Sequence, residues 1–92
     1  MPSYQENAKI FKAFCDPKRL AVLDQLRTGE KCACVLMELL NLTQSGLSYH
    51  MKILCESGIV SSRQEGRWIY YQLNPSGRDL ALTLLKELTT PI

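Results

Sequence analysis

The spacing of apolar residues changes at Gly58 in this 92-residue chain. Before Gly58 the apolar residues recur every three or four positions, which is the spacing of one face of an α-helix. After it, residues 59–63 and 68–73 alternate with a period of two, and Gly66 lies between them. This pattern predicts a β-hairpin that turns near Gly66. The chain is therefore expected to fold into helices followed by one hairpin.

Two helices are predicted in the first 29 residues. The first has two apolar rows, so that one row can face the core and the other a partner. These rows are Tyr4, Ala8, Phe11 and Cys15, and Ile10 and Phe14. Asp16 is a typical N-cap and Pro17 suits the first helical position, so a second helix begins there. We expect Gly29 to end it.

Two further helices are predicted before the change of period. The third is short and covers about residues 33–40, and Asn41 or Thr43 caps a fourth that runs to about Glu56 and is closed by Gly58. Helical geometry gives the fourth helix an apolar inner face and a polar outer face. The inner face holds Leu47, Met51, Leu54 and Cys55, and the outer face holds Gln44, Ser45, Ser48, Tyr49 and Lys52.

A last helix begins at Asn74, Pro75 and Ser76 and is apolar around more than one face. Its apolar residues are Leu80, Ala81, Leu82, Leu84, Leu85 and Leu88. A chain of this size buries only a modest fraction of its surface when alone. We therefore expect a homodimer formed through the first and last helices. No repeat, low-complexity tract or dividing linker is present, so residues 1–92 are expected to form one domain of winged helix-turn-helix order.

The composition says more about the cellular compartment than about the function. Four cysteines are too few for a disulfide scaffold, and the sequence has no signal peptide and no apolar run of about 18 residues. A cytoplasmic protein with reduced thiols and no membrane association is expected. The net charge of +2 is weak support for any partner, so a nucleic-acid function has to rest on where the basic residues lie.

Cys32 and Cys34 stand one residue apart where the third helix should begin. Thiolates prefer soft ions, and a single histidine cannot supply a nitrogen-rich zinc site, so As(III), Sb(III) or Cd(II) suit the pair. On a regular helix two such side chains point about 200° apart. Capture of one ion by both should therefore distort the start of the third helix, next to the fourth. The alternative is that cysteines simply fill the core, as we expect for Cys15 and Cys55.

Three stretches resemble the ArsR/SmtB-type metal-responsive repressors, namely residues 14–20, 42–54 and 65–71. They are similar to the family's entry into the second helix, its recognition helix and its wing. The resemblance implies a DNA-binding repressor, and the Cys-x-Cys pair is similar to that of the arsenic and antimony repressors. Met37 stands where a third cysteine is often found. A third ligand is thus left open among Cys15, Cys55, the other protomer and a small thiol. The last helix lacks the pattern of the zinc sensors.

Eight residues are candidates for contact with double-stranded operator DNA, because the fourth helix of this order enters the major groove and the hairpin reaches the backbone or minor groove. They are Gln44, Ser45, Ser48, Tyr49, His50, Lys52, Arg63 and Arg67. His50 has an alternative role as a packed residue. Arg63 and Arg67, expected at the hairpin tip, have the alternative of a solvated turn.

The function expected from these observations is repression that ends when Cys32 and Cys34 bind the inducing ion, with no permanently bound cofactor. A repressor of the same fold that senses oxidants or reactive sulfur is the first alternative. A thiol enzyme is disfavoured because the sequence has no Cys-x-x-Cys and no βαβ order. A winged helix that binds proteins instead of DNA is a further alternative. The sequence specifies neither the operator nor the physiological ion.

Overall fold

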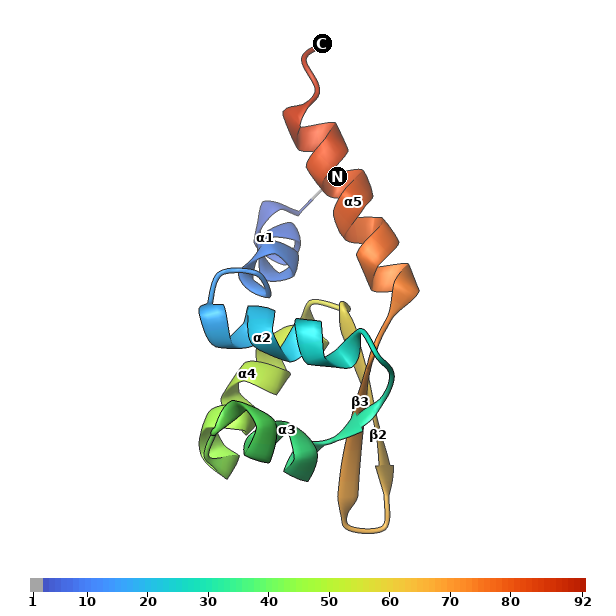
Figure 1. The fold of residues 1–92 in the computed structure, drawn as a ribbon. Helices are drawn as coiled ribbons and strands as arrows, with labels where there is room; N and C mark the ends of the chain where they lie inside the picture. Colours follow the sequence, from blue (N-terminus) through green and yellow to red (C-terminus); the bar gives the residue numbers. More distant parts are fainter. Residues whose placement is uncertain (1–2) are drawn as a thin grey trace.

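The computed structural model describes residues 3–92. They form five helices and three strands, in the order α1 Tyr4–Lys12, α2 Pro17–Leu26, β1 Lys31–Cys32, α3 Ala33–Leu40, α4 Gln44–Glu56, β2 Val60–Glu65, β3 Trp68–Leu73 and α5 Pro75–Thr89. Figure 1 shows an elongated molecule in which the β2–β3 hairpin projects at one end and α5 at the other. The predicted winged helix-turn-helix order, mainly α with a hairpin, is confirmed.

Side-chain caps and left-handed residues set the helix limits. The Asp16 carboxylate accepts hydrogen bonds from the backbone N–H groups of Lys18 and Arg19 and so begins α2. The Thr43 hydroxyl does the same for α4 by accepting from Gly46. Asn41, with a φ of 52°, ends α3 in the left-handed conformation. The predicted limits of α3 and α4 are therefore confirmed, whereas α2 ends at Leu26, before the predicted stop at Gly29.

The wing is a three-stranded sheet with the order β1-β3-β2. The strands β2 and β3 pair in antiparallel register from Val60 opposite Leu73 to Glu65 opposite Trp68, and Gly66 turns the hairpin with a φ of 61°. The hairpin prediction is confirmed. The two-residue strand β1 is absent from the sequence prediction, and it places Cys32 opposite Tyr70 of β3.

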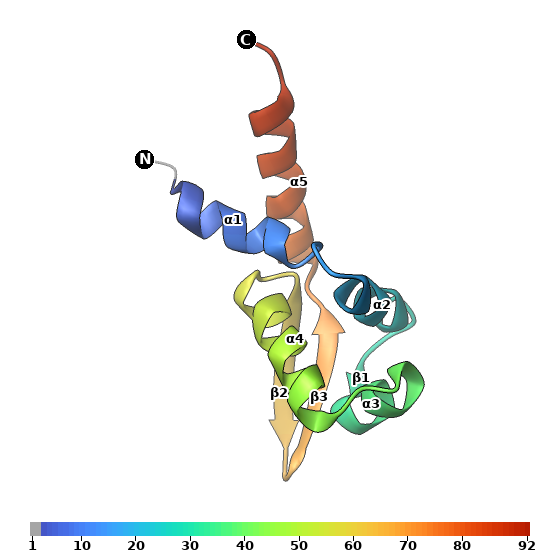
Figure 2. The ribbon, with the colours of Figure 1, turned by 90° about the vertical axis from the view of Figure 1, so that its left-hand side faces the viewer.

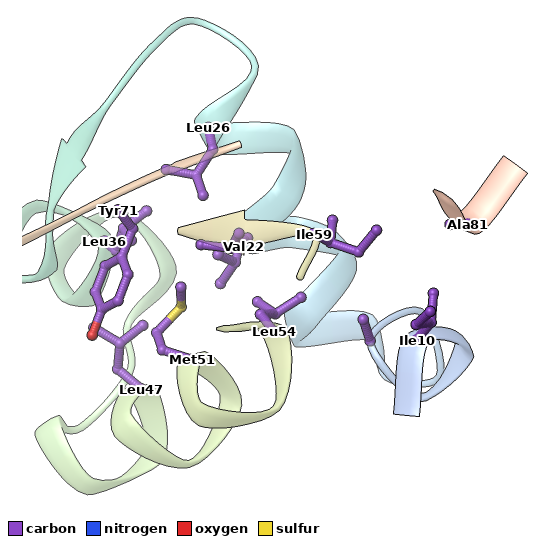
Figure 3. Packing of buried hydrophobic residues seen from close by; sticks show 12 residues of the cluster. Ile10, Val22, Leu26, Leu36, Leu47, Met51, Leu54, Ile59, Tyr71 and Ala81 are labelled. Carbon is purple, nitrogen blue, oxygen red and sulfur yellow. The ribbon is translucent and has the colours of Figure 1, made fainter. Parts of the chain in front are cut away.

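The core lies between α2, α3, α4 and the base of the sheet, and extends to α1 and α5 (Figure 3). Leu36, Met51, Leu54 and Val22 are its largest fully buried side chains. The predicted inner face of α4 is confirmed, since three of its residues are buried and Cys55 packs against the core. On α2 the buried face is set by Val22 and Leu26, and Leu20 is left 49% exposed.

The helices α1 and α5 contact each other at the end of the molecule opposite the hairpin tip (Figure 2). Only Gly77 and Ala81 of α5 are buried, whereas four of its leucines are more than half exposed: Leu80, Leu82, Leu85 and Leu88. An apolar groove of about 730 Å³ runs between α1, α2 and α5, with Phe14 and Leu85 in its lining. A single copy of the chain therefore leaves this surface uncovered, which agrees with the sequence expectation for the last helix.

No helix in the described part of the chain combines the length and the apolar content that crossing a bilayer requires. The longest is α5, with 15 residues.

Replacement of Gly77 by alanine is expected to destabilise the fold by about 3 kcal/mol. A Cβ atom at Gly77 would lie 1.8 Å from the carbonyl oxygen of Gly58, so α5 would have to move off the loop before β2. Urea unfolding at equal protein concentration measures the effect. The matched control is Gly46→Ala, whose Cβ would meet only the Thr43 hydroxyl at 3.0 Å and which gains about 1 kcal/mol in helix propensity. Equal unfolding midpoints for the two variants would contradict the close approach.

Candidate thiol site and nucleic-acid interface

Cys32 and Cys34 flank the junction between β1 and α3. Cys32 is the N-cap residue of α3 and has an extended backbone, with φ −68° and ψ 145°, while Cys34 lies in the first turn of the helix. Both residues reach solvent, and neither is in a disulfide. The Cys34 thiol donates a hydrogen bond to the Cys32 sulfur, and the two sulfur atoms are 2.8 Å apart.

This geometry corrects the expectation that ion capture must distort α3. The expected divergence of about 200° applies only when both residues are helical, and Cys32 precedes the helix. Its extended backbone turns the two sulfurs toward each other without any change in α3. A metal held at about 2.3 Å from each sulfur with a tetrahedral angle separates them by roughly 3.8 Å. Side-chain rotation that separates the two sulfurs by about 1 Å more is therefore sufficient for both to bind one ion.

The two thiols differ in acidity. The hydrogen bond donated by Cys34 has the largest effect and lowers the pKa of Cys32 from its ordinary value. Desolvation opposes it, and the backbone N–H groups of Cys34 and Val35 lower the pKa further. The same hydrogen bond raises the pKa of Cys34, as do desolvation and the negative charge on Cys32. Cys32 is thus the first of the pair to become a thiolate, which is the form that binds soft ions.

Iodoacetamide at neutral pH is expected to modify Cys32 several-fold faster than Cys34, because a lowered pKa leaves more thiolate at a given pH. Peptide mass spectrometry at short reaction times measures both rates. Cys55 is the internal control, since burial raises its pKa and should make it slow. Cys34→Ala removes the donor and should slow the reaction of Cys32. Equal rates for the two thiols, or no effect of that variant, would show that the hydrogen bond does not control their acidity.

The other two cysteines lie away from this pair. Cys15 follows α1, is exposed, and donates to the carbonyl of Phe11 at 3.4 Å, so its predicted burial in the core is wrong. Cys55 packs against the core, as expected. Within residues 3–92 no group of three or more Cys, His, Asp or Glu side chains is placed to hold a metal ion. The structure therefore does not bring Cys15 or Cys55 of the same chain to the pair as a third ligand.

The outer face of α4 has the polar character expected of a DNA-reading surface. Its exposed residues include all five predicted for that face, namely Gln44, Ser45, Ser48, Tyr49 and Lys52. A hollow of about 180 Å³ lies between α3, α4 and β3, and Cys34, Gln44 and Trp68 are among its lining residues. Cys34 thus shares this hollow with Gln44 and Ser48, two of the residues predicted to read bases.

His50 is not part of this outer face. It is 7% exposed, and its Nδ1 lies 3.0 Å from Nη1 of the buried Arg19. The prediction that His50 contacts DNA is therefore corrected by its position on the inner side of α4, and its alternative role as a packed residue is the observed one. Sequence reasoning missed the Arg19 partner, because helical spacing on α2 gives no sign of a charge that turns inward.

Arg63 lies within β2, opposite Tyr70, and not at the hairpin tip as predicted. Its guanidinium donates to both carboxylate oxygens of Glu30, at 2.7 and 2.9 Å, and to Glu65 at 2.7 Å. These bonds raise the pKa of Arg63 and lower the pKa of Glu30. They occupy the side chain and tie the wing to the residue before β1. Sequence reasoning missed Glu30, which lies 33 residues from its partner.

Arg67 is at the hairpin turn and remains available to a partner. Its guanidinium carbon lies 5.2 Å from the centre of the Trp68 ring, and the side chains of both residues are exposed. Contact of Arg67 and of the α4 face with DNA stays a prediction.

Comparison with known proteins gives a consistent family assignment for this arrangement. Residues 16–62 match the model of the bacterial regulatory proteins of the arsR family. The arsenical resistance operon repressor of Staphylococcus xylosus is 46% identical over 72 residues, which span 78% of this chain and 69% of that repressor. An uncharacterized HTH-type transcriptional regulator of Methanocaldococcus jannaschii is 42% identical over 89 residues, 96% of this chain and all of that protein.

Among solved structures, the chain is similar to the winged helix-turn-helix DNA-binding domain of a possible ArsR-family transcriptional regulator from Mycobacterium bovis. That domain is described as homodimeric in solution. The TM-score is 0.72 at 26% sequence identity, and the match covers 91% of this chain and 82% of the other.

Proposed function

Because the chain belongs to the ArsR family of bacterial regulatory proteins, which are DNA-binding regulators and not enzymes, we propose that it represses transcription and is induced by a metalloid or soft metal ion. The ion-free homodimer binds operator DNA in the cytoplasm. It leaves the operator when Cys32 and Cys34 capture As(III), Sb(III) or Cd(II). The observation that carries this proposal is the pair of accessible sulfurs 2.8 Å apart beside the polar face of α4.

The DNA-binding step follows from the exposed chemistry of α4 and the wing. In helix-turn-helix docking the second helix enters the major groove with its N-terminus first, which brings Gln44, Ser45 and Ser48 to base edges. Glutamine can pair with adenine, and serine can reach a base or a phosphate. Lys52 suits phosphate, and Arg67 at the turn of the hairpin reaches the backbone or the minor groove.

We propose that a second copy of the chain buries the apolar surface of α1 and α5. A homodimer joined there would bury the groove that Phe14 and Leu85 line and would place two recognition helices about 34 Å apart, one turn of DNA. The homodimeric state described for the similar domain of Mycobacterium bovis supports this arrangement.

Ion binding is proposed to reach the DNA-binding face through two contacts of the thiol site. Cys32 pairs with Tyr70 of β3 through the backbone of β1. Cys34 lies in α3, which packs against α4. Side-chain rotation admits the ion, and the bound ion then ties β1 to the start of α3, so that the hairpin and α4 are held in a relative position that does not fit the operator. By linkage, bound DNA must weaken ion binding by the same factor.

The ion needs at least one ligand beyond the two thiolates if it is three-coordinate. No side chain of the same protomer within residues 3–92 completes such a set, so we propose that a small thiol or a residue of the partner subunit supplies it. X-ray absorption of the arsenite-loaded dimer counts the sulfur neighbours. Loss of one sulfur in Cys15→Ser or Cys55→Ser would assign the ligand to the partner subunit, and no loss in either would assign it to a small thiol.

The proposal is tested with purified protein and a DNA fragment from the promoter of its own gene. Binding should prefer that fragment over unrelated DNA, weaken as salt is raised and be lost on addition of arsenite. A monomer at micromolar concentration with no sequence preference would overturn it.

Oxidant sensing is the second candidate, because the lowered pKa of Cys32 also favours reaction with peroxide. Adding peroxide in place of arsenite to the promoter-binding assay distinguishes oxidant sensing from ion sensing. Release by peroxide alone would make the protein a redox repressor. A bond between Cys32 and Cys34 themselves is less favourable than one to another thiol, because residues so close in the chain form a strained ring.

A further inference from the structure

Arg19 is a buried charge that forms no ion pair within the described residues. Its side chain is 5% exposed. Nη2 donates to the backbone carbonyl of Lys12 at 3.0 Å, and Nη1 lies 3.0 Å from His50 Nδ1. Its Nε is buried and has no hydrogen-bond partner in the described part of the chain. Burying such a group is costly, so packing alone does not account for it.

The contact fixes the charge state of His50. A guanidinium only donates hydrogen bonds, so His50 Nδ1 must accept, which places the single ring proton on Nε2 and leaves the ring neutral. A protonated ring has a donor at both nitrogens. It would turn an N–H toward the Arg19 guanidinium and bring two positive charges together in the interior.

The bridge joins the two surfaces that the proposed repressor uses. The Lys12 carbonyl belongs to the last turn of α1, in the proposed dimer surface, and His50 belongs to the recognition helix α4. Arg19 on α2 is hydrogen-bonded to both the Lys12 carbonyl and His50. The rings of His50 and Tyr49 also meet in a T-shaped contact, with their centres 5.2 Å apart, and Tyr49 is on the exposed DNA-reading face.

We propose that Arg19 and His50 are positioning residues, which set the recognition helix against the dimer helix, and that protonation of His50 opens their contact and lowers operator affinity. This inference rests on the proposed function. Histidine is the side chain that ordinarily changes charge between about pH 5 and 8. Because His50 is the single histidine of the chain, mild acid acts on one site of this kind.

Few charges face this pair. From the α2 segment they are Arg19 itself and Asp16, whose carboxylate is held by the N–H groups of Lys18 and Arg19. Burial raises the pKa of Asp16, but these bonds and the positive charges of Arg19 and of a protonated His50 bring it below its ordinary value. Asp16 therefore keeps its charge in mild acid and offsets part of the repulsion between Arg19 and a protonated His50. From α1 the contact is the carbonyl of Lys12, and on α4 the neighbouring titratable group is Tyr49.

The test compares operator affinity at about pH 7 and about pH 5.5, on either side of the ordinary histidine pKa, for the whole dimer. The probe is a duplex that the wild-type protein selects from random DNA, and all proteins carry Cys32→Ser and Cys34→Ser so that thiol titration does not contribute. His50→Asn keeps an acceptor near the position of Nδ1 but takes up no proton in this range. The protein that retains His50 should lose about tenfold more affinity on acidification than the His50→Asn variant.

Arg19→Met removes the bridge and replaces the buried charge by an apolar chain, a change that proteins often tolerate. It should fold and dimerise, as circular dichroism and sedimentation measure, yet bind the duplex about tenfold more weakly at both pH values. An equal pH dependence with and without His50→Asn, or unchanged affinity for Arg19→Met, would overturn the inference while leaving the repressor intact. If the wild-type protein selects no duplex at all, the proposed function fails and the inference with it.

Discussion

A variant with serine at both Cys32 and Cys34 is expected to bind its promoter as the wild-type protein does and to remain bound when arsenite is added. In the wild-type protein, arsenite should weaken operator binding roughly 100-fold, within the usual range of coupling between two ligand sites. The reason is local, because within residues 3–92 these two are the accessible sulfurs that the structure places together. Fluorescence anisotropy of labelled promoter DNA, titrated with and without arsenite, measures both affinities.

The matched controls are Cys15→Ser and Cys55→Ser, which remove a thiol without touching the pair. Each should still release DNA on arsenite addition, even if one of them lowers the arsenite affinity. Release of the promoter by the double serine variant would remove the sensor role from Cys32 and Cys34 and leave only the DNA-binding architecture.

Replacement of Leu85 by glutamate is expected to convert the dimer to a monomer and to lower operator affinity at least about 100-fold. Leu85 is 51% exposed in a single copy and lines the apolar groove between α1, α2 and α5. A carboxylate there would be buried without a partner in the dimer. A monomer also loses the gain in affinity that comes from holding two half-sites at once. Sedimentation at micromolar concentration and promoter binding measure the two effects.

Thr83→Glu is the control for Leu85→Glu, because it adds the same charge to the same helix at an exposed position outside the groove. It should remain dimeric and bind DNA. A dimeric Leu85→Glu protein would place the subunit interface elsewhere on the molecule.

The limits of the helices and the turn of the hairpin could be predicted from the sequence because their causes are local. The Asp16 cap, the Thr43 cap and the left-handed Gly66 each act on backbone groups within three residues. The polar outer face of α4 follows in the same way from the 3.6-residue period. The pairing of Cys32 with Cys34 as a candidate site also came from two near neighbours in the chain.

The arrangement of the site was decided by contacts between distant residues. The strand β1 has two residues, too few to show a period, and it exists because β3 offers a free edge for it. That pairing holds Cys32 extended, which brings the sulfurs together where a helical geometry for both residues would keep them apart. The prediction that Cys15 lies in the core rests on the same helical assumption, yet α1 ends at Lys12 and leaves it exposed.

The charged residues also differ in what the sequence determines and what the tertiary structure determines. The sequence alone determined that the chain is a winged helix-turn-helix with a polar reading helix, because period and capping are properties of short segments. Only the tertiary structure decided that Arg63 is held by Glu30 and that His50 turns inward to Arg19, across 33 and 31 residues of chain. A charge has no preferred face in a periodic pattern, and its partner is set by which segments the fold brings within hydrogen-bond reach.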